Sequence, residues 1–139
     1  MTRMNRAEAV EFLAAGSRPG KLSTAGPDPH VTPIWFVVDG PDLVFTTGQT
    51  SVKGRRLLAD PRAALCVDTE VFPYDFVVVR GPVALAPDAP DLVEWATRIA
   101  RRYVPAEKAS WYGERNGVPG EMLCRLRMDR ITAERDIAL

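Results

Sequence analysis

Four residues near the middle of the chain have the types and spacing to bind an anion. Thr46 and Thr47 close an apolar run, and Ser51 and Lys53 follow four and six residues after Thr47. Since Ser51 can cap a helix, hydroxyls, free backbone amides and an ammonium group can converge there, an arrangement that suits a phosphate. In the alternative interpretation the threonines are ordinary strand residues, Ser51 is only a cap and Lys53 is a solvated lysine.

Other reactive residue types are sparse. His30 is the only histidine, at a loop-to-strand junction, and either contacts a cofactor or has a structural role. Cys66 and Cys124 each lie in an apolar run without a Cys-x-x-Cys or Cys/His cluster, so we expect two free, buried thiols and no metal site. No Gly-x-Gly-x-x-Gly, P-loop or nucleophile elbow is present. The candidate anion site therefore dominates the functional interpretation.

Length and charge narrow the classes of protein further. A chain of 139 residues fits one domain. Its 18 basic and 18 acidic residues balance, so we expect no nucleic acid or anionic membrane as a partner. Glu8 and Glu11 interrupt the N-terminal stretch where a signal peptide would be apolar, and no apolar run reaches the roughly 20 residues of a membrane span. We expect a cytoplasmic protein.

The elements that position these residues follow from periodicity and turn signals. Apolar runs between turns predict six strands, at 21–24, 31–38, 43–47, 63–68, 76–85 and 122–128. Capping residues and the spacing i, i+3, i+4 predict four helices, from Asn5 to near Gly16, from Thr50 or Ser51 to near Asp60, over 92–103, and over 106–112 before Gly113. Pro82 suits an edge or a bulge. Mostly antiparallel strands with inserted helices favour a barrel.

The order of motifs between Pro29 and Asp68 resembles the cofactor-binding half of the pyridoxamine 5′-phosphate oxidase-like family. The motifs are Pro-His-x-Thr-Pro-x-Trp, then Thr-Thr at a strand end, then Ser-x-Lys, then Leu-x-x-Asp-Pro-Arg. The VRGPV strand, the Ala/Arg-rich helix and the closing LCRLRMDRITAERD resemble, more loosely, members that depend on coenzyme F420. The resemblance covers most of the chain, with its specificity concentrated between residues 29 and 62.

This resemblance implies a fold and an assembly. The fold is mainly β with inserted helices, a split β-barrel of the FMN-binding type, built from one domain over 1–139 and homodimeric, with the cofactor at the dimer interface. The residues that it implies as cofactor contacts are His30, Val31, Thr32, Pro33, Ile34, Trp35, Thr46, Thr47, Ser51, Lys53, Arg56 and Phe76.

Several of these assignments leave alternatives open. The strand from Val31 would lie under the flavin ring, where Pro33 removes one amide donor. Either Trp35 or its neighbour Phe36 is expected in the core, because adjacent strand residues face opposite sides. Arg56 stands where the family often has Asn, and Gly54 where it has Ala, so Arg56 could instead face solvent or pair with Asp60.

Two further segments could reach the site of a partner subunit. One is the strand start at Asp75 and Phe76, and the other is the helix at Trp111 and Tyr112, whose aromatic side chains could equally be packing residues.

The implied function is F420-dependent transfer of a hydride from reduced deazaflavin to a small conjugated organic substrate. Water can supply the accompanying proton, so no catalytic residue is assigned. One alternative is an FMN-binding pyridoxamine 5′-phosphate oxidase-like protein, and the other is a non-catalytic cofactor- or haem-binding protein.

Overall fold

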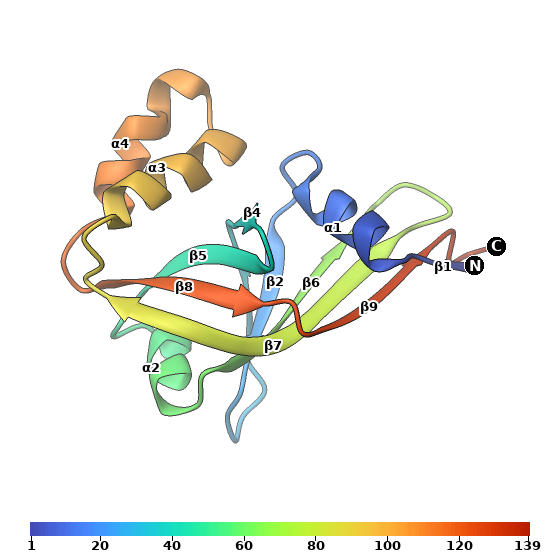
Figure 1. Ribbon diagram of the computed structural model, residues 1–139, viewed down its shortest axis with the longest axis horizontal. Helices are drawn as coiled ribbons and strands as arrows, with labels where there is room; N and C mark the ends of the chain where they lie inside the picture. Colours follow the sequence, from blue (N-terminus) through green and yellow to red (C-terminus); the bar gives the residue numbers. More distant parts are fainter.

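A single curled sheet, in which every strand pairing is antiparallel, forms the body of the protein (Figure 1). The computed structural model describes all residues, 1–139. The strands are β1 (Thr2–Arg3), β2 (Gly20–Thr24), β3 (Val31–Ile34), β4 (Val37–Asp39), β5 (Asp42–Gly48), β6 (Arg62–Asp68), β7 (Phe76–Pro87), β8 (Glu121–Arg127) and β9 (Arg130–Arg135). The helices are α1 (Arg6–Ala14), α2 (Val52–Ala59), α3 (Leu92–Tyr103) and α4 (Ala109–Asn116), with a 3₁₀ turn η1 (Ala106–Lys108). This architecture agrees with the expected split barrel.

The sheet curls because its two ends are joined by only two residues. The strand order is β3-β2-β6-β7-β8-β5-β4, so β3 and β4 lie at opposite ends of the path although only Trp35 and Phe36 separate them in sequence. The expected single strand over 31–38 is therefore wrong. The chain pairs with β2 up to Ile34 and then crosses to pair with β5 from Val37.

Side chains of α3 satisfy the backbone polar groups at this crossing. Arg102 donates to the carbonyl of Phe36 at 2.8 Å, and the Tyr103 hydroxyl lies 3.3 Å from the Phe36 amide nitrogen. Arg102 also donates to the carbonyls of Leu13 at 2.6 Å and Gly16 at 2.9 Å, just where α1 ends. Because buried backbone groups need partners, these two side chains replace the strand pairing that the crossing lacks.

A bulge lets one edge of β7 pair with two successive strands. Leu126 of β8 lies opposite Val83, and Arg130 of β9 lies opposite Arg80, so the β8–β9 side has one residue more than β7 between these pairs. A Cβ on Gly81 would overlap the carbonyl of Arg127, so the close approach requires glycine. Of the two settings expected for Pro82, an edge or a bulge, the structure confirms the bulge.

The last strand that the sequence predicted, over 122–128, is present as β8, whereas β1 and β9 were not predicted.

The main core fills the curled sheet and is closed by α1. The largest fully buried side chains include Phe36, Phe45 and Leu13. Helix α1 buries Leu13 in that core and begins at the expected capping box, with the Glu8 amide donating to the Asn5 side chain at 2.8 Å. Phe36 is thus the core member of the Trp35–Phe36 pair.

Helices α3 and α4 form a hairpin that projects from the sheet (Figure 1). We expected a helix over 106–112 that stops at Gly113, but α4 runs on to Asn116 after the turn η1. Gly113 is buried, and a Cβ there would overlap the side chain of Thr97 on α3. The glycine therefore permits close helix packing rather than ending the helix. No helix of the structure has the length and apolar character to cross a membrane.

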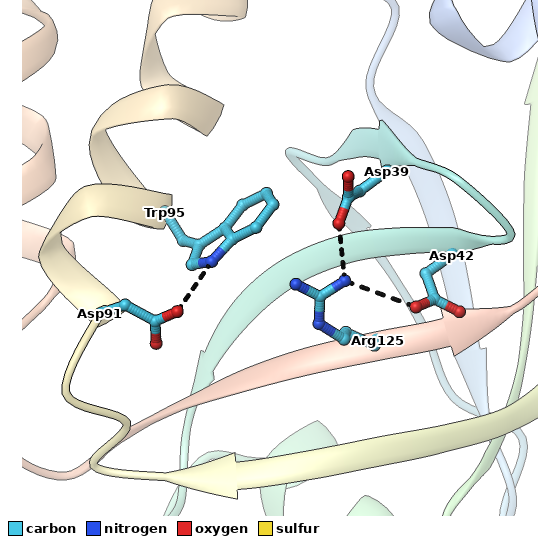
Figure 2. A network of polar contacts seen from close by, with 5 residues as sticks. All are labelled: Asp39, Asp42, Asp91, Trp95 and Arg125. Carbon is cyan, nitrogen blue, oxygen red and sulfur yellow. Dashed lines mark hydrogen bonds and ion pairs between the residues drawn. The ribbon is translucent and has the colours of Figure 1, made fainter.

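A polar and aromatic network fixes α3 over β5 and β8 (Figure 2). Arg125 of β8 pairs with Asp39 at 2.9 Å and Asp42 at 3.4 Å, and the Trp95 ring of α3 lies 4.9 Å from its guanidinium carbon. Trp95 donates through Nε1 to Asp91 at 3.1 Å. The ion pairs raise the pKa of Arg125. The contact between Trp95 and Arg125 holds the inner face of α3 against the sheet.

Both cysteines are free, as expected. Cys124 is fully buried, and burial raises the pKa of its thiol to about 12. Cys66 is only half-buried, so the expectation of two buried thiols is wrong for it; burial and then the nearby Asp68 still raise the pKa of Cys66. Neither thiol has the thiolate character of a reactive cysteine.

Candidate functional site

A pocket of about 270 Å³ gathers most of the residues that the sequence indicated. Seven of the twelve expected contacts line it: Pro33, Ile34, Trp35, Thr46, Thr47, Ser51 and Lys53. Five further residues that were not predicted complete it: Gly48, Ala96, Ile99, Asn116 and Glu121. The pocket lies where the ends of β3 and β5, the start of α2 and the inner face of α3 meet.

The corner between β5 and α2 is held by a local hydrogen-bond network. Ser51 Oγ accepts from the Gly54 amide at 3.0 Å and donates to the Gly48 carbonyl at 2.9 Å, and Thr47 Oγ1 lies 3.2 Å from it. A Cβ on Gly54 would overlap the Gly48 carbonyl, so this close approach requires glycine. The expected Ser51 cap is confirmed.

The same corner leaves donors free for a ligand. The backbone amides of Val52 and Lys53 are in the first turn of α2 and have no intrahelical acceptor. The Lys53 side chain is half-buried and forms no ion pair. The Lys53 side chain and the first amides of α2 therefore lie together at the start of one helix, which is an arrangement that favours a bound anion.

An aromatic wall forms another side of the pocket. The Trp35 ring stacks on Tyr103 with centroids 5.3 Å apart and an interplanar angle of 4°, and the Tyr112 ring meets Trp35 edge-on at 5.8 Å. Tyr112 is thus a packing residue, whereas Trp111 is 60% exposed. Burial raises the pKa of Tyr103. Of these three aromatic residues, Trp35 lines the pocket, where its ring can contact a planar ligand.

Glu121 is the only acidic residue that lines the pocket. It begins β8 opposite Gly48 of β5, and its Oε2 is buried without a hydrogen-bond partner. Burial raises the pKa of Glu121, and the positive charge of Lys53 opposes that rise. Nothing in the local sequence around Glu121 indicated this position, because the pairing of β5 with β8 brings it to the pocket.

Five expected contacts lie outside the pocket. Val31 and Thr32 lie on β3 before the pocket, His30 precedes that strand, and Phe76 begins β7 opposite Asp68. The buried nitrogen His30 Nδ1 and the hydroxyl Thr32 Oγ1 have no partner.

Arg56 also points away from the pocket. Its guanidinium donates to the carbonyl of Asp28 at 2.6 Å and packs against Gly26, and Asp60 pairs with Arg62 rather than with Arg56. Within this chain, Arg56 ties α2 to the turn between β2 and β3.

A larger pocket, of about 550 Å³, is lined by the end of β2, the start of β6, the middle of β7 and the β8–β9 connection. Arg62, Arg80 and Arg130 line it, but Arg62 is paired with Asp60, and no aromatic side chain contributes to it. The smaller pocket combines anion donors with a flat apolar wall and is therefore the better candidate.

Comparisons with known proteins agree with this fold. The family model described as pyridoxamine 5′-phosphate oxidase matches residues 6–133. A search of curated protein sequences found no match. Among solved structures, a conserved hypothetical protein from Mycobacterium tuberculosis, Rv2991, has a TM-score of 0.80 at 22% identity, with 99% of this chain and 90% of that chain covered.

Two other similar solved structures are of proteins whose names include a cofactor. A protein titled F420 reductase has a TM-score of 0.67 at 28% identity, with 87% of this chain and 94% of that chain covered. An FAD-binding protein from Mesorhizobium loti has a TM-score of 0.67 at 19% identity, with 94% and 93% covered. Since the family model spans nearly the whole chain, this protein belongs to the pyridoxamine 5′-phosphate oxidase family.

Proposed function

We propose that the protein is an F420-dependent oxidoreductase that transfers a hydride from reduced deazaflavin to a small conjugated organic substrate. The observation that carries this proposal is the corner between β5 and α2, where Ser51, Lys53 and free amides face a pocket walled by Trp35. Similarity at 28% identity to a protein titled F420 reductase supports deazaflavin as the cofactor.

The residues of the pocket fit such a group. Lys53 and the first amides of α2 bind the phosphate, while Ser51 holds the turn that aims those amides. The outer edge of β3 has no strand partner, so its backbone can face a flat ring, with Pro33 offering no amide donor. Trp35, backed by Tyr103, excludes water from one side. The deazaflavin, when bound, supplies the hydride-donating carbon.

The same proposal includes a homodimer with the cofactor at its interface. The pocket, at about 270 Å³, is smaller than the roughly 300–1,000 Å³ of pockets that enclose a drug-sized ligand. A copy of the chain that packed over this pocket would add a second wall and enclose the cofactor.

A patch of exposed apolar side chains offers the matching surface. We call it the terminal patch, and it comprises Met1, Val71, Phe72, Tyr74, Ile137 and Leu139. Hydrogen bonds from the Ile137 amide to the Tyr74 carbonyl and from the Ala138 amide to the Pro73 carbonyl join the C-terminus to the β6–β7 loop. The loop and both termini lie at the end of the molecule opposite α2 and α3 (Figure 1). A two-fold axis would bring this end of one copy to the pocket of the other.

The dimer is expected to sediment as a single species of twice the chain mass at micromolar concentration. Phe72→Asp places a charge in the terminal patch and is expected to shift the protein to monomer and to weaken F420 binding together. Glu70→Gln, in the same loop and exposed, is the control and should leave both unchanged. A monomeric wild-type protein that binds F420 tightly would exclude the shared site.

The choice of cofactor is tested by titrating the apoprotein with F420 and FMN side by side and following ligand fluorescence. We expect F420 to bind about tenfold more tightly, a difference of about 1.4 kcal/mol. Membership of the pyridoxamine 5′-phosphate oxidase family keeps an FMN-binding protein as the second candidate. A yellow protein on purification that does not exchange with F420 would establish that candidate. Binding of haem in place of either would support a non-catalytic function.

A further inference from the structure

Glu121 brings negative charge to the corner that the proposed function assigns to phosphate. The residue faces Gly48 across β5 and β8, and its Oε2 is 3.6 Å from the point where a Cβ on Gly48 would lie. That oxygen is buried and accepts no hydrogen bond. A carboxylate that contributed only to folding would be paired or solvated, because an unpartnered buried oxygen is costly.

The charged and titratable groups around Glu121 do not neutralise it. Lys53 on α2 attracts it but forms no ion pair with it within 4.0 Å. Asp88, between β7 and α3, uses its carboxylate to accept from the Gly120 amide at 2.8 Å and from the Gln49 side chain at 3.4 Å. Cys124 on β8 is a neutral thiol at physiological pH. Lys53 is therefore the only cationic side chain of the pocket, and it faces both Glu121 and any bound anion.

Resting on the proposed function, we propose that Glu121 is a specificity residue that favours a singly charged phosphodiester, as in F420, over a doubly charged phosphomonoester, as in FMN. Glu121 repels a phosphomonoester dianion about twice as strongly as a phosphodiester monoanion, and this repulsion offsets the correspondingly stronger attraction that Lys53 exerts on the dianion. The pocket thus discriminates between cofactors by the charge of the phosphate in addition to the shape of the ring.

The discrimination must depend on pH. A phosphomonoester loses its second proton near pH 6, by analogy with phosphorylated side chains, whereas a phosphodiester keeps one charge. Burial holds the pKa of Glu121 above its ordinary value. Discrimination is therefore complete at a pH above both pKa values, and it is lost as acidification protonates Glu121 and the monoester.

The test compares FMN with its phosphate methyl ester, which has the same ring and one negative charge less. Both are titrated into wild type and Glu121→Gln at pH 8 and pH 5.5, directly or by displacement of F420. At pH 8, Glu121→Gln is expected to shift the ratio of the two dissociation constants about tenfold in favour of FMN. At pH 5.5 the shift should be less than about threefold. Any steric effect of the methyl group is the same in both proteins and cancels.

Two further variants separate this inference from the proposed function. Glu107→Gln removes an exposed carboxylate outside the pocket and should leave the ratio unchanged. Lys53→Met should weaken both esters. If Lys53→Met weakens both but Glu121→Gln leaves the ratio unchanged, the inference is wrong and the proposed site stands. If Lys53→Met affects neither ester, or no flavin or deazaflavin binds, the proposed site fails and the inference with it. Thermal melts establish that each variant is folded.

Discussion

Replacing Lys53 by alanine is expected to weaken binding of F420 and of FMN by about tenfold to a hundredfold. A charge-assisted hydrogen bond to phosphate contributes about 1.5 to 3 kcal/mol, and about 1.4 kcal/mol corresponds to a factor of ten. Folding should change little, because Lys53 forms no ion pair that the variant would lose. Fluorescence titration measures the affinity, and a thermal melt of the apoprotein measures the stability.

Arg55→Ala is the matched control for Lys53→Ala. Arg55 lies two residues further along α2, is exposed and does not line the pocket, so its removal should leave cofactor affinity within about twofold. Unchanged affinity in Lys53→Ala would mean that Lys53 is a solvated surface residue. Weakened affinity together with early melting of the apoprotein would mean that the side chain is structural and acts on binding indirectly.

The sequence predicted the β5–α2 corner because its chemistry is local. Thr47, Ser51 and Lys53 lie within seven residues, and a strand end followed by a capped helix fixes how they meet. Glu121 and Asn116 belong to the same pocket but reach it from segments more than 60 residues away. Their positions depend on strand register and on the α3–α4 hairpin, which no local pattern encodes.

The crossing from β3 to β4 was missed for a related reason. Residues Ile34 to Val38 are all apolar, so the run has no turn signal where the chain changes strand partner. Strand β9 did carry a weak signal, since Ile131 and Ala133 alternate with polar residues, but the flanking arginines hid it. Apolar periodicity identified the strands that form the core and failed at the crossing, where side-chain hydrogen bonds replace strand pairing.

Arg102 is the clearest case of a side chain that holds separate segments together. Its guanidinium donates to four carbonyls, three at the end of α1 and one at the β3–β4 crossing, and lies 4.6 Å from the centre of the Phe36 ring. The planar fork of arginine can reach several acceptors at once, whereas the ammonium of lysine cannot match that geometry. Removing the side chain leaves the carbonyls at the end of α1 without this donor and leaves the Phe36 carbonyl with the Tyr103 hydroxyl at 3.2 Å, so we expect α3 to loosen from the sheet.

Arg102→Ala is therefore expected to lower the free energy of unfolding by about 2 to 4 kcal/mol, since hydrogen bonds to charged groups contribute about 1.5 to 3 kcal/mol each and this site is partly solvated. The melting temperature should fall by roughly 6 to 16 °C. Arg102→Lys keeps the charge, so its melting temperature should lie between those of Arg102→Ala and wild type. Arg101→Ala, next on the same helix but exposed, should melt within about 2 °C of wild type. Because Ala96 and Ile99 of α3 line the pocket, Arg102→Ala should also weaken F420 binding at temperatures where the variant protein is still folded. Calorimetry and titration on the same samples measure both effects. A variant that melts like Arg101→Ala would show that solvent replaces these hydrogen bonds and that the crossing does not depend on α3.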